Sequence, residues 1–97
     1  MNVRLLPTAR QDILDSARFY EDREPGLGRR FYTIIERALN DLSWQAGSHP
    51  RIDKKYSVKY VRTFPYAIYY YVANGEAHVD AILDTRRDPH YVSDRLQ

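Results

Sequence analysis

The spacing of the apolar residues changes once along the chain, and this change constrains the fold more than any other feature. From Thr8 to Trp44 apolar side chains recur at the three- or four-residue spacing of amphipathic helices. After Tyr56 they alternate with polar side chains, as in strands that bury one face. Because the helices precede most of the strands, the pattern predicts an α+β fold rather than alternating β-α units.

Two helices joined by a short turn are predicted in the first half. The first begins at Pro7-Thr8 and ends before Pro25-Gly26, since proline is tolerated in the first helical turn and Pro-Gly interrupts a helix. The second ends near Trp44, before the helix-breaking residues 47–50. Its apolar stripe consists of Leu27, Phe31, Ile34, Ala38 and Leu42. A connection this short predicts an antiparallel helical hairpin.

Strands are predicted before the first helix and after the second. A short opening strand stops at Pro7, and three more span Val58–Phe64, Tyr66–Val72 and Ala77–Asp84. Asn74-Gly75 is typical of a tight hairpin turn, because both residues tolerate positive φ. The predicted architecture is β-α-α-β-β-β, a helical hairpin packed on one face of a small antiparallel-meander sheet.

The last strand predicts a sheet with one covered face. Its apolar residues Ala77, Val79, Ala81 and Leu83 are spaced by two, so we expect this face to pack on the helices and the other to stay open. Residues Pro89–Gln97 are expected to form a short terminal helix or to fray.

The composition predicts a single folded domain over residues 1–97, because 43% of its 97 residues are hydrophobic. The absence of cysteine excludes disulfides, thiol catalysis and cysteine-based zinc sites. His49, His78 and His90 lack paired ligand spacing, so neither a metal nor a cofactor is expected. No apolar run is long enough for a signal peptide or a membrane span, and we expect a cytoplasmic protein.

Arginines gather where the last predicted strand ends. Arg86 and Arg87 follow Asp84-Thr85, and Arg62 lies in the first strand of the meander. Their planar, permanently charged guanidinium groups suit phosphate or carboxylate recognition. The alternative is that Arg87 forms an ordinary surface ion pair with Asp84 or Asp88.

Two further features each allow two interpretations. The tyrosines of the sheet, among them Tyr60 and Tyr69, could stack nucleic-acid bases or could simply fill a half-buried surface. On the second helix, Tyr32, Ile35 and Leu39 widen the apolar arc, which indicates either a protein interface or a deeper core.

Three segments together resemble the RelE/ParE toxin superfamily of bacterial type II toxin–antitoxin systems. They are Phe19-Tyr20 with Pro25-Gly26-Leu27-Gly28 and Phe31, the stretch Phe64-Pro65-Tyr66-Ala67-Ile68-Tyr69-Tyr70, and Arg87-Asp88-Pro89. The resemblance spans nearly the whole chain in the same order. It implies a toxin that is neutralised by a cognate antitoxin in a hetero-oligomer, and that arrests growth and stabilises plasmids when released.

The superfamily contains two activities. RelE-like members are ribosome-dependent mRNA endonucleases, whereas ParE-like members inhibit DNA gyrase and cut no RNA. Here Ala67 stands where the nucleases usually carry an arginine, and Val58-Lys59-Tyr60 replaces their lysine-x-lysine pattern. The resemblance therefore favours the ParE-like branch, with no catalytic residues. A nuclease, or a degenerate module that only binds an antitoxin, remains an alternative.

The resemblance also assigns residues to these roles. Target binding falls to the region where the last predicted strand ends, which we call the C-terminal edge, and a nuclease would use Arg62, Arg87 and Tyr91 for catalysis. An antitoxin helix would lie across the helical hairpin. The expected target-binding residues are Arg62, Arg86, Arg87, Asp88 and Tyr91, and the expected antitoxin-binding residues are Tyr32, Ile35 and Leu39.

Overall fold

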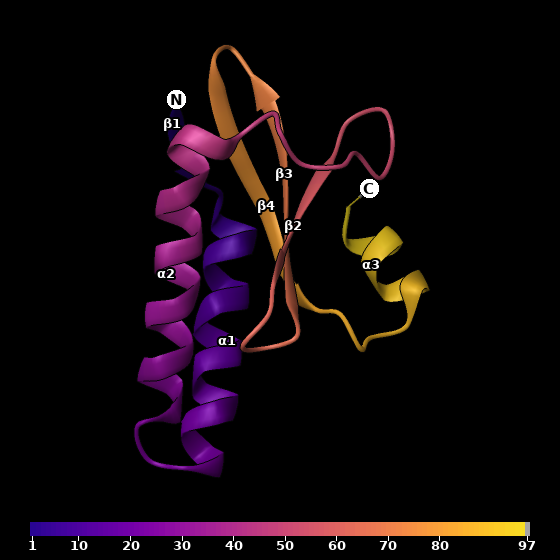
Figure 1. Ribbon diagram of the computed structural model, residues 1–97. Coiled ribbons are helices and arrows are strands. Elements are labelled where there is room, and N and C mark those ends of the chain that lie inside the picture. Colours follow the sequence, from indigo (N-terminus) through magenta and orange to yellow (C-terminus); the bar gives the residue numbers. More distant parts are fainter. Residues whose placement is uncertain (97) are drawn as a thin grey trace.

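The chain builds a helical hairpin, a sheet and a short terminal helix in three layers. The computed structural model describes residues 1–96, and Gln97, the last residue of the predicted terminal segment, lies outside the described residues. In chain order the elements are β1 (Asn2–Leu5), α1 (Pro7–Arg23), α2 (Leu27–Gln45), β2 (Ser57–Val61), β3 (Tyr66–Ala73), β4 (Glu76–Asp84) and α3 (Pro89–Arg95). Figure 1 shows the α1–α2 hairpin on one side of the sheet and α3 on the other. The predicted α+β architecture is confirmed, with α3 added at its end.

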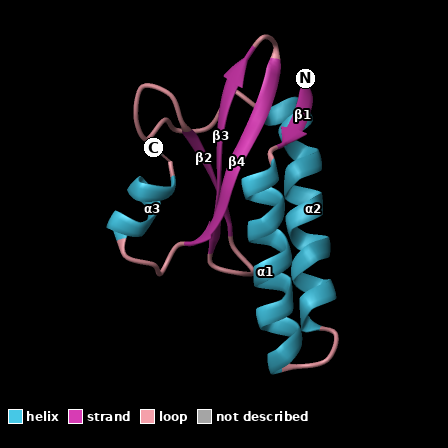
Figure 2. Cartoon of the chain, turned by 180° about the vertical axis from the view of Figure 1, so that it is seen from behind, coloured by secondary structure: helices cyan, strands magenta, loops and turns pink. Residues whose placement is uncertain are grey.

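The four-stranded sheet has the order β1-β4-β3-β2. Strands β2, β3 and β4 form the predicted antiparallel meander. Strand β1 lies parallel to β4, with Asn2 opposite Glu76 and Leu5 opposite Val79. Because the hairpin connects β1 to the rest of the sheet, both helices remain on one face, as the view from behind also shows (Figure 2).

The outer edge of β2 is partly closed by the loop before it. The Val58 N–H donates to the Pro50 carbonyl oxygen at 3.0 Å, and the Ile52 N–H donates to the Tyr56 oxygen at 2.9 Å. Arg51 forms an isolated antiparallel bridge with Ser57. The outward-facing backbone groups at the start of β2 are therefore already hydrogen-bonded to the preceding loop.

Helices α1 and α2 pack closely at Gly28. A Cβ atom there would lie 2.4 Å from the Ala17 carbonyl oxygen, so this position excludes any side chain. The Glu21 carboxylate closes the connection by accepting the N–H groups of Gly26 at 2.9 Å and Gly28 at 3.0 Å. These hydrogen bonds lower the pKa of Glu21, and the one from Gly26 contributes most.

The core lies between the hairpin and the sheet. Rings of Tyr20, Phe31, Phe64 and Tyr66 pack on one another with centroids 4.8–6.2 Å apart. The buried side of α2 differs from the predicted apolar stripe. Ile35 is 0% exposed and belongs to the core with Phe31 and Leu42, whereas Ile34 is only half-buried.

A β-bulge at Asp80 changes the direction of side chains along β4. Tyr70 lies opposite Val79 and Tyr69 lies opposite Ala81, so Asp80 has no partner on β3. Ala77 and Val79 consequently pack toward the hairpin, but Ala81 and Leu83 join a second apolar cluster with Val58, Ala67 and Tyr69. The prediction that all four residues of β4 share one face is wrong beyond the bulge.

The second cluster is covered by α3. Tyr91, Val92 and Leu96 pack against it from the side opposite the hairpin. The face that was predicted to stay open is therefore covered at this end, and the terminal segment forms a helix over Pro89–Arg95. Strand β2 is also shorter than predicted, because it ends at Val61 and leaves Arg62 in the turn that follows.

We predict that Gly28→Ala destabilises the fold by about 1–3 kcal/mol, because the new methyl group must push α1 and α2 apart. Urea unfolding followed by circular dichroism measures this change. Ser43→Ala, at an exposed position of the same helix, is the matched control and should differ little from the unmodified chain. Equal stability of the two variants would contradict the close packing.

Candidate functional site

A groove runs between α1 and α2 on the outer side of the hairpin. It encloses about 330 Å³, and its lining residues are Leu5, Arg10, Ile13, Leu14, Tyr32, Ile35, Glu36, Leu39 and Asn40. Leu14 is 53% exposed and Tyr32 is 46% exposed, while Leu39 is half-buried. Of the three residues expected to bind an antitoxin, Tyr32 and Leu39 are thus accessible. Ile35 is buried and can only support the groove from beneath.

Tyr32 extends this groove toward the hairpin turn. Its side chain also borders a shallow depression formed by Ala17, Arg18, Glu21, Asp22, Gly28 and Arg29. Because Gly28 has no side chain, nothing from this position fills the depression. The accessible apolar surface is therefore elongated along the hairpin, with charged residues of both signs at its border.

Arg86, just after the C-terminal end of β4, is held by a neighbouring carboxylate. Its Nε and Nη2 atoms donate to the two oxygens of Asp84 at 3.1 and 2.7 Å. The Arg86 side chain lowers the pKa of Asp84 through these hydrogen bonds. The predicted surface ion pair thus exists, but Arg86 forms it instead of Arg87.

Arg87 instead lies over an aromatic ring. Its guanidinium carbon is 4.4 Å from the centre of the Tyr91 ring, a cation–π arrangement. Within residues 1–96 its guanidinium forms neither an ion pair nor a hydrogen bond, so its donors are available to a partner. Asp88 has a local role, since its carboxylate accepts the His90 N–H at 2.8 Å and caps α3.

Arg62 reaches the same end of the sheet from a different element. It is exposed in the turn between β2 and β3. The Thr85 N–H donates to the Pro65 carbonyl oxygen of that turn at 2.7 Å, which fixes the turn beside the end of β4. The structure therefore brings the three predicted arginines to the same end of the sheet, and of the three it is Arg87 that contacts Tyr91.

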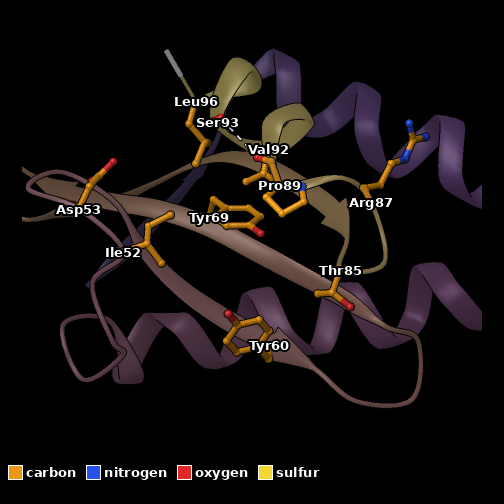
Figure 3. A pocket seen from close by; sticks show the side chains of 10 residues that line it. All are labelled: Ile52, Asp53, Tyr60, Tyr69, Thr85, Arg87, Pro89, Val92, Ser93 and Leu96. Atoms are coloured by element: carbon orange, nitrogen blue, oxygen red, sulfur yellow. Dashed lines mark hydrogen bonds between the residues drawn. The ribbon is translucent and has the colours of Figure 1, made fainter.

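A cleft separates α3 from the sheet and the loop before β2 (Figure 3). It encloses about 540 Å³, with Tyr69 at its floor and Ile52 and Asp53 on the loop side. Val92 of α3 and Leu96, just after that helix, border it on the other side. Of these residues only Tyr69 is a candidate from the sequence. The apolar spacing gives no signal of the bulge that turns Ala81 and Leu83 toward this side.

An ion pair fixes α3 to the hairpin. Arg95 donates through Nη1 and Nη2 to both oxygens of Asp12, at 2.8 and 2.9 Å. Asp12 also accepts the Ile82 N–H at 3.0 Å. Hydrogen bonding to Asp12 raises the pKa of Arg95. This contact was also missed, since nothing in the sequence links positions 12 and 95.

The loop that borders the cleft is anchored to the sheet at His49. Its Nδ1 atom lies 2.6 Å from the Tyr70 hydroxyl, and the Gly47 N–H donates to the same hydroxyl at 3.4 Å. Burial lowers the pKa of His49 below its ordinary value of 6.5, and the positive charge of Lys59 lowers it further. Lys59 itself points toward α2, where its Nζ donates to Gln45 Oε1 at 2.6 Å.

Most sheet tyrosines serve packing. Tyr66, Tyr69 and Tyr70 are buried, whereas Tyr60 is exposed beside the cleft. Across residues 1–96, no group of three or more potential ligands could hold a metal ion. No helix in that part of the chain is long and apolar enough to cross a membrane.

A helical hairpin packed on one face of a four-stranded sheet, with a short helix on the other face, defines a small α+β domain. Among solved structures, the chain is similar to one described as "Chromosomal ParDE TA system from P. aeruginosa", with a TM-score of 0.78 and 15% sequence identity. The likeness covers 84% of this chain and 92% of that chain. No protein-family model and no curated protein matches the sequence. The comparison establishes a shared fold.

We predict that the unmodified chain loses stability as the pH falls through about 6.5. The unfolded chain binds a proton at His49 near pH 6.5, whereas the folded chain binds it only at a lower pH. Between these two values protonation favours unfolding, and the loss stops once the folded state is protonated as well. Urea unfolding at several pH values between 5 and 8 measures the effect.

His49→Gln is the matched variant for this experiment, because it removes the titrating ring and leaves His78 and His90 in place. Its stability should depend less on pH over the same interval. An unchanged pH dependence would show that His49 is not the group responsible.

Proposed function

We propose that the chain is the toxin component of a bacterial type II toxin–antitoxin module, and that its cognate antitoxin binds the groove of the α1–α2 hairpin. The observation that carries this proposal is the accessible apolar groove, with Leu14 and Tyr32 exposed on a domain that shares the fold of a ParDE chain. An elongated apolar groove between two helices suits the apolar face of an amphipathic partner helix. Binding would remove the exposed apolar side chains from water.

We further propose that the target is DNA gyrase, contacted by Arg62, Arg86, Arg87, Asp88 and Tyr91 at the C-terminal edge. Arg87 is the strongest candidate among them, because its guanidinium has no carboxylate partner in the described chain. Arg86 is partly neutralised by Asp84, and the Asp88 carboxylate caps α3. These two should contribute less than Arg87.

Two observations favour a gyrase inhibitor over an mRNA endonuclease. Ala67, at the position where the nucleases usually carry an arginine, is buried in the second apolar cluster. Lys59 points to α2 and burial lowers its pKa, so it is turned away from the C-terminal edge. A nuclease would have only Arg62, Arg87 and Tyr91 on this edge to stabilise charge and move protons during cleavage.

Expression of the unmodified chain without its antitoxin should arrest bacterial growth and induce the SOS response, while mRNA stays intact. Arg87→Ala should raise the expression needed for arrest about tenfold, equivalent to ~1.4 kcal/mol of binding. Tyr91→Phe keeps the ring beneath Arg87 and removes the hydroxyl, so it should stay toxic. Arrest with cut mRNA that Tyr91→Phe abolishes would instead identify the nuclease.

Tyr32→Arg combined with Leu39→Asp should weaken antitoxin binding about a hundredfold, because each charge replaces an apolar contact surface. Coexpression with the antitoxin encoded beside the chain would then no longer restore growth, and calorimetry with that antitoxin gives the affinity. The matched control carries the same new side chains at exposed positions of α2 that do not line the groove, as Thr33→Arg with Arg37→Asp. Full rescue of the groove variant would contradict the proposed interface.

A further inference from the structure

Helix α3 is too short and too exposed to be stable without contacts to the rest of the chain. It spans only seven residues, and none of them is buried. A helix of this length is unstable in isolation, so its position depends on contacts with the rest of the chain. Within residues 89–96, those contacts are the packing of Tyr91, Val92 and Leu96 on the second apolar cluster and the ion pair from Arg95.

The Arg95–Asp12 pair has the geometry of a specific attachment. The terminal nitrogens Nη1 and Nη2 each donate to one carboxylate oxygen, at 2.8 and 2.9 Å, which fixes the orientation as well as the distance. The side chains are 26% and 12% exposed, so solvent screens this pair less than the Arg86–Asp84 pair. Asp12 is itself fixed by the Ile82 N–H, just past the bulge.

Arg95 is one helical turn beyond Tyr91, whose ring supports the Arg87 guanidinium. Movement of α3 would therefore displace Tyr91 and remove the support from Arg87. We infer that Asp12 and Arg95 are positioning residues, which hold α3 so that Arg87 and Tyr91 present a formed surface to the target. This inference rests on the proposed function of the C-terminal edge.

The pair also connects two surfaces that are separate in the fold. Asp12 precedes Ile13 and Leu14, which line the hairpin groove, whereas Arg95 belongs to the helix that borders the cleft. The same carboxylate thus contacts α3 and β4 from a helix that forms one wall of the groove. Asp12 also lines a small pocket together with Asp84, Arg87 and Tyr91, so a change at Asp12 should alter the C-terminal edge.

The test combines amide hydrogen exchange with growth arrest for three variants of the full chain. Arg95→Met keeps the long stem and removes the charge and the donors, Asp12→Asn removes the partner charge, and Arg95→Lys keeps the charge without the planar fork. We expect α3 amides to exchange about tenfold faster in the first two variants, while the amides of β3 change much less. The expression needed for arrest should rise about tenfold in both, with Arg95→Lys intermediate.

Arg37→Met, at an exposed position of α2, is the matched control and should leave exchange and toxicity unchanged. Equal acceleration at α3 and β3 would show a merely structural contribution and overturn the inference. So would unchanged exchange in α3, or faster exchange in α3 with undiminished growth arrest. If the unmodified chain does not arrest growth, the proposed function fails, and the exchange data alone then decide whether the pair holds α3.

Discussion

The bulge at Asp80 is the constraint on which the rest of the structure depends. One extra residue in β4 turns Ala81 and Leu83 away from the hairpin, while Val79 and Ile82 stay on the hairpin side. A single strand therefore supplies apolar side chains to both faces of the sheet. Without the second cluster, α3 would have no apolar surface to cover, and the cleft beside it would not form.

Asp12 compensates for the irregularity that follows the bulge. Strand β1 has already ended opposite Val79, so no neighbouring strand is available to the Ile82 N–H on that side. Asp12 Oδ2 accepts this hydrogen bond, and both Asp12 carboxylate oxygens also accept hydrogen bonds from Arg95. A buried backbone donor is satisfied, and the carboxylate that satisfies it is itself neutralised. The two requirements are met by a single side chain on α1.

The sequence predicts where helices and strands lie better than it predicts which of their sides is buried. Helix α1, the meander and the Asn74-Gly75 turn follow from apolar spacing and turn residues, because these signals are local. The burial of Ile35 depends on how α1 packs beside α2, and the bulge depends on how β3 and β4 pair. Both are tertiary effects that no window of sequence contains. In the same way the arginines at positions 62, 86 and 87 are visible in the sequence, but the partners of Arg86 and Arg87 are not.

The loop along β2 has a consequence for how copies of this chain behave at high concentration. Its backbone occupies the start of one sheet edge, since the Val58 N–H already donates to Pro50 and Arg51 bridges to Ser57. The opposite edge is β1, which offers only four residues. A fibril of paired sheets needs two long, free edge strands on each molecule, so that each molecule can pair with a neighbour on both sides. This sheet offers neither, so its geometry disfavours runaway polymerisation into fibrils even though the domain exposes apolar side chains along its hairpin.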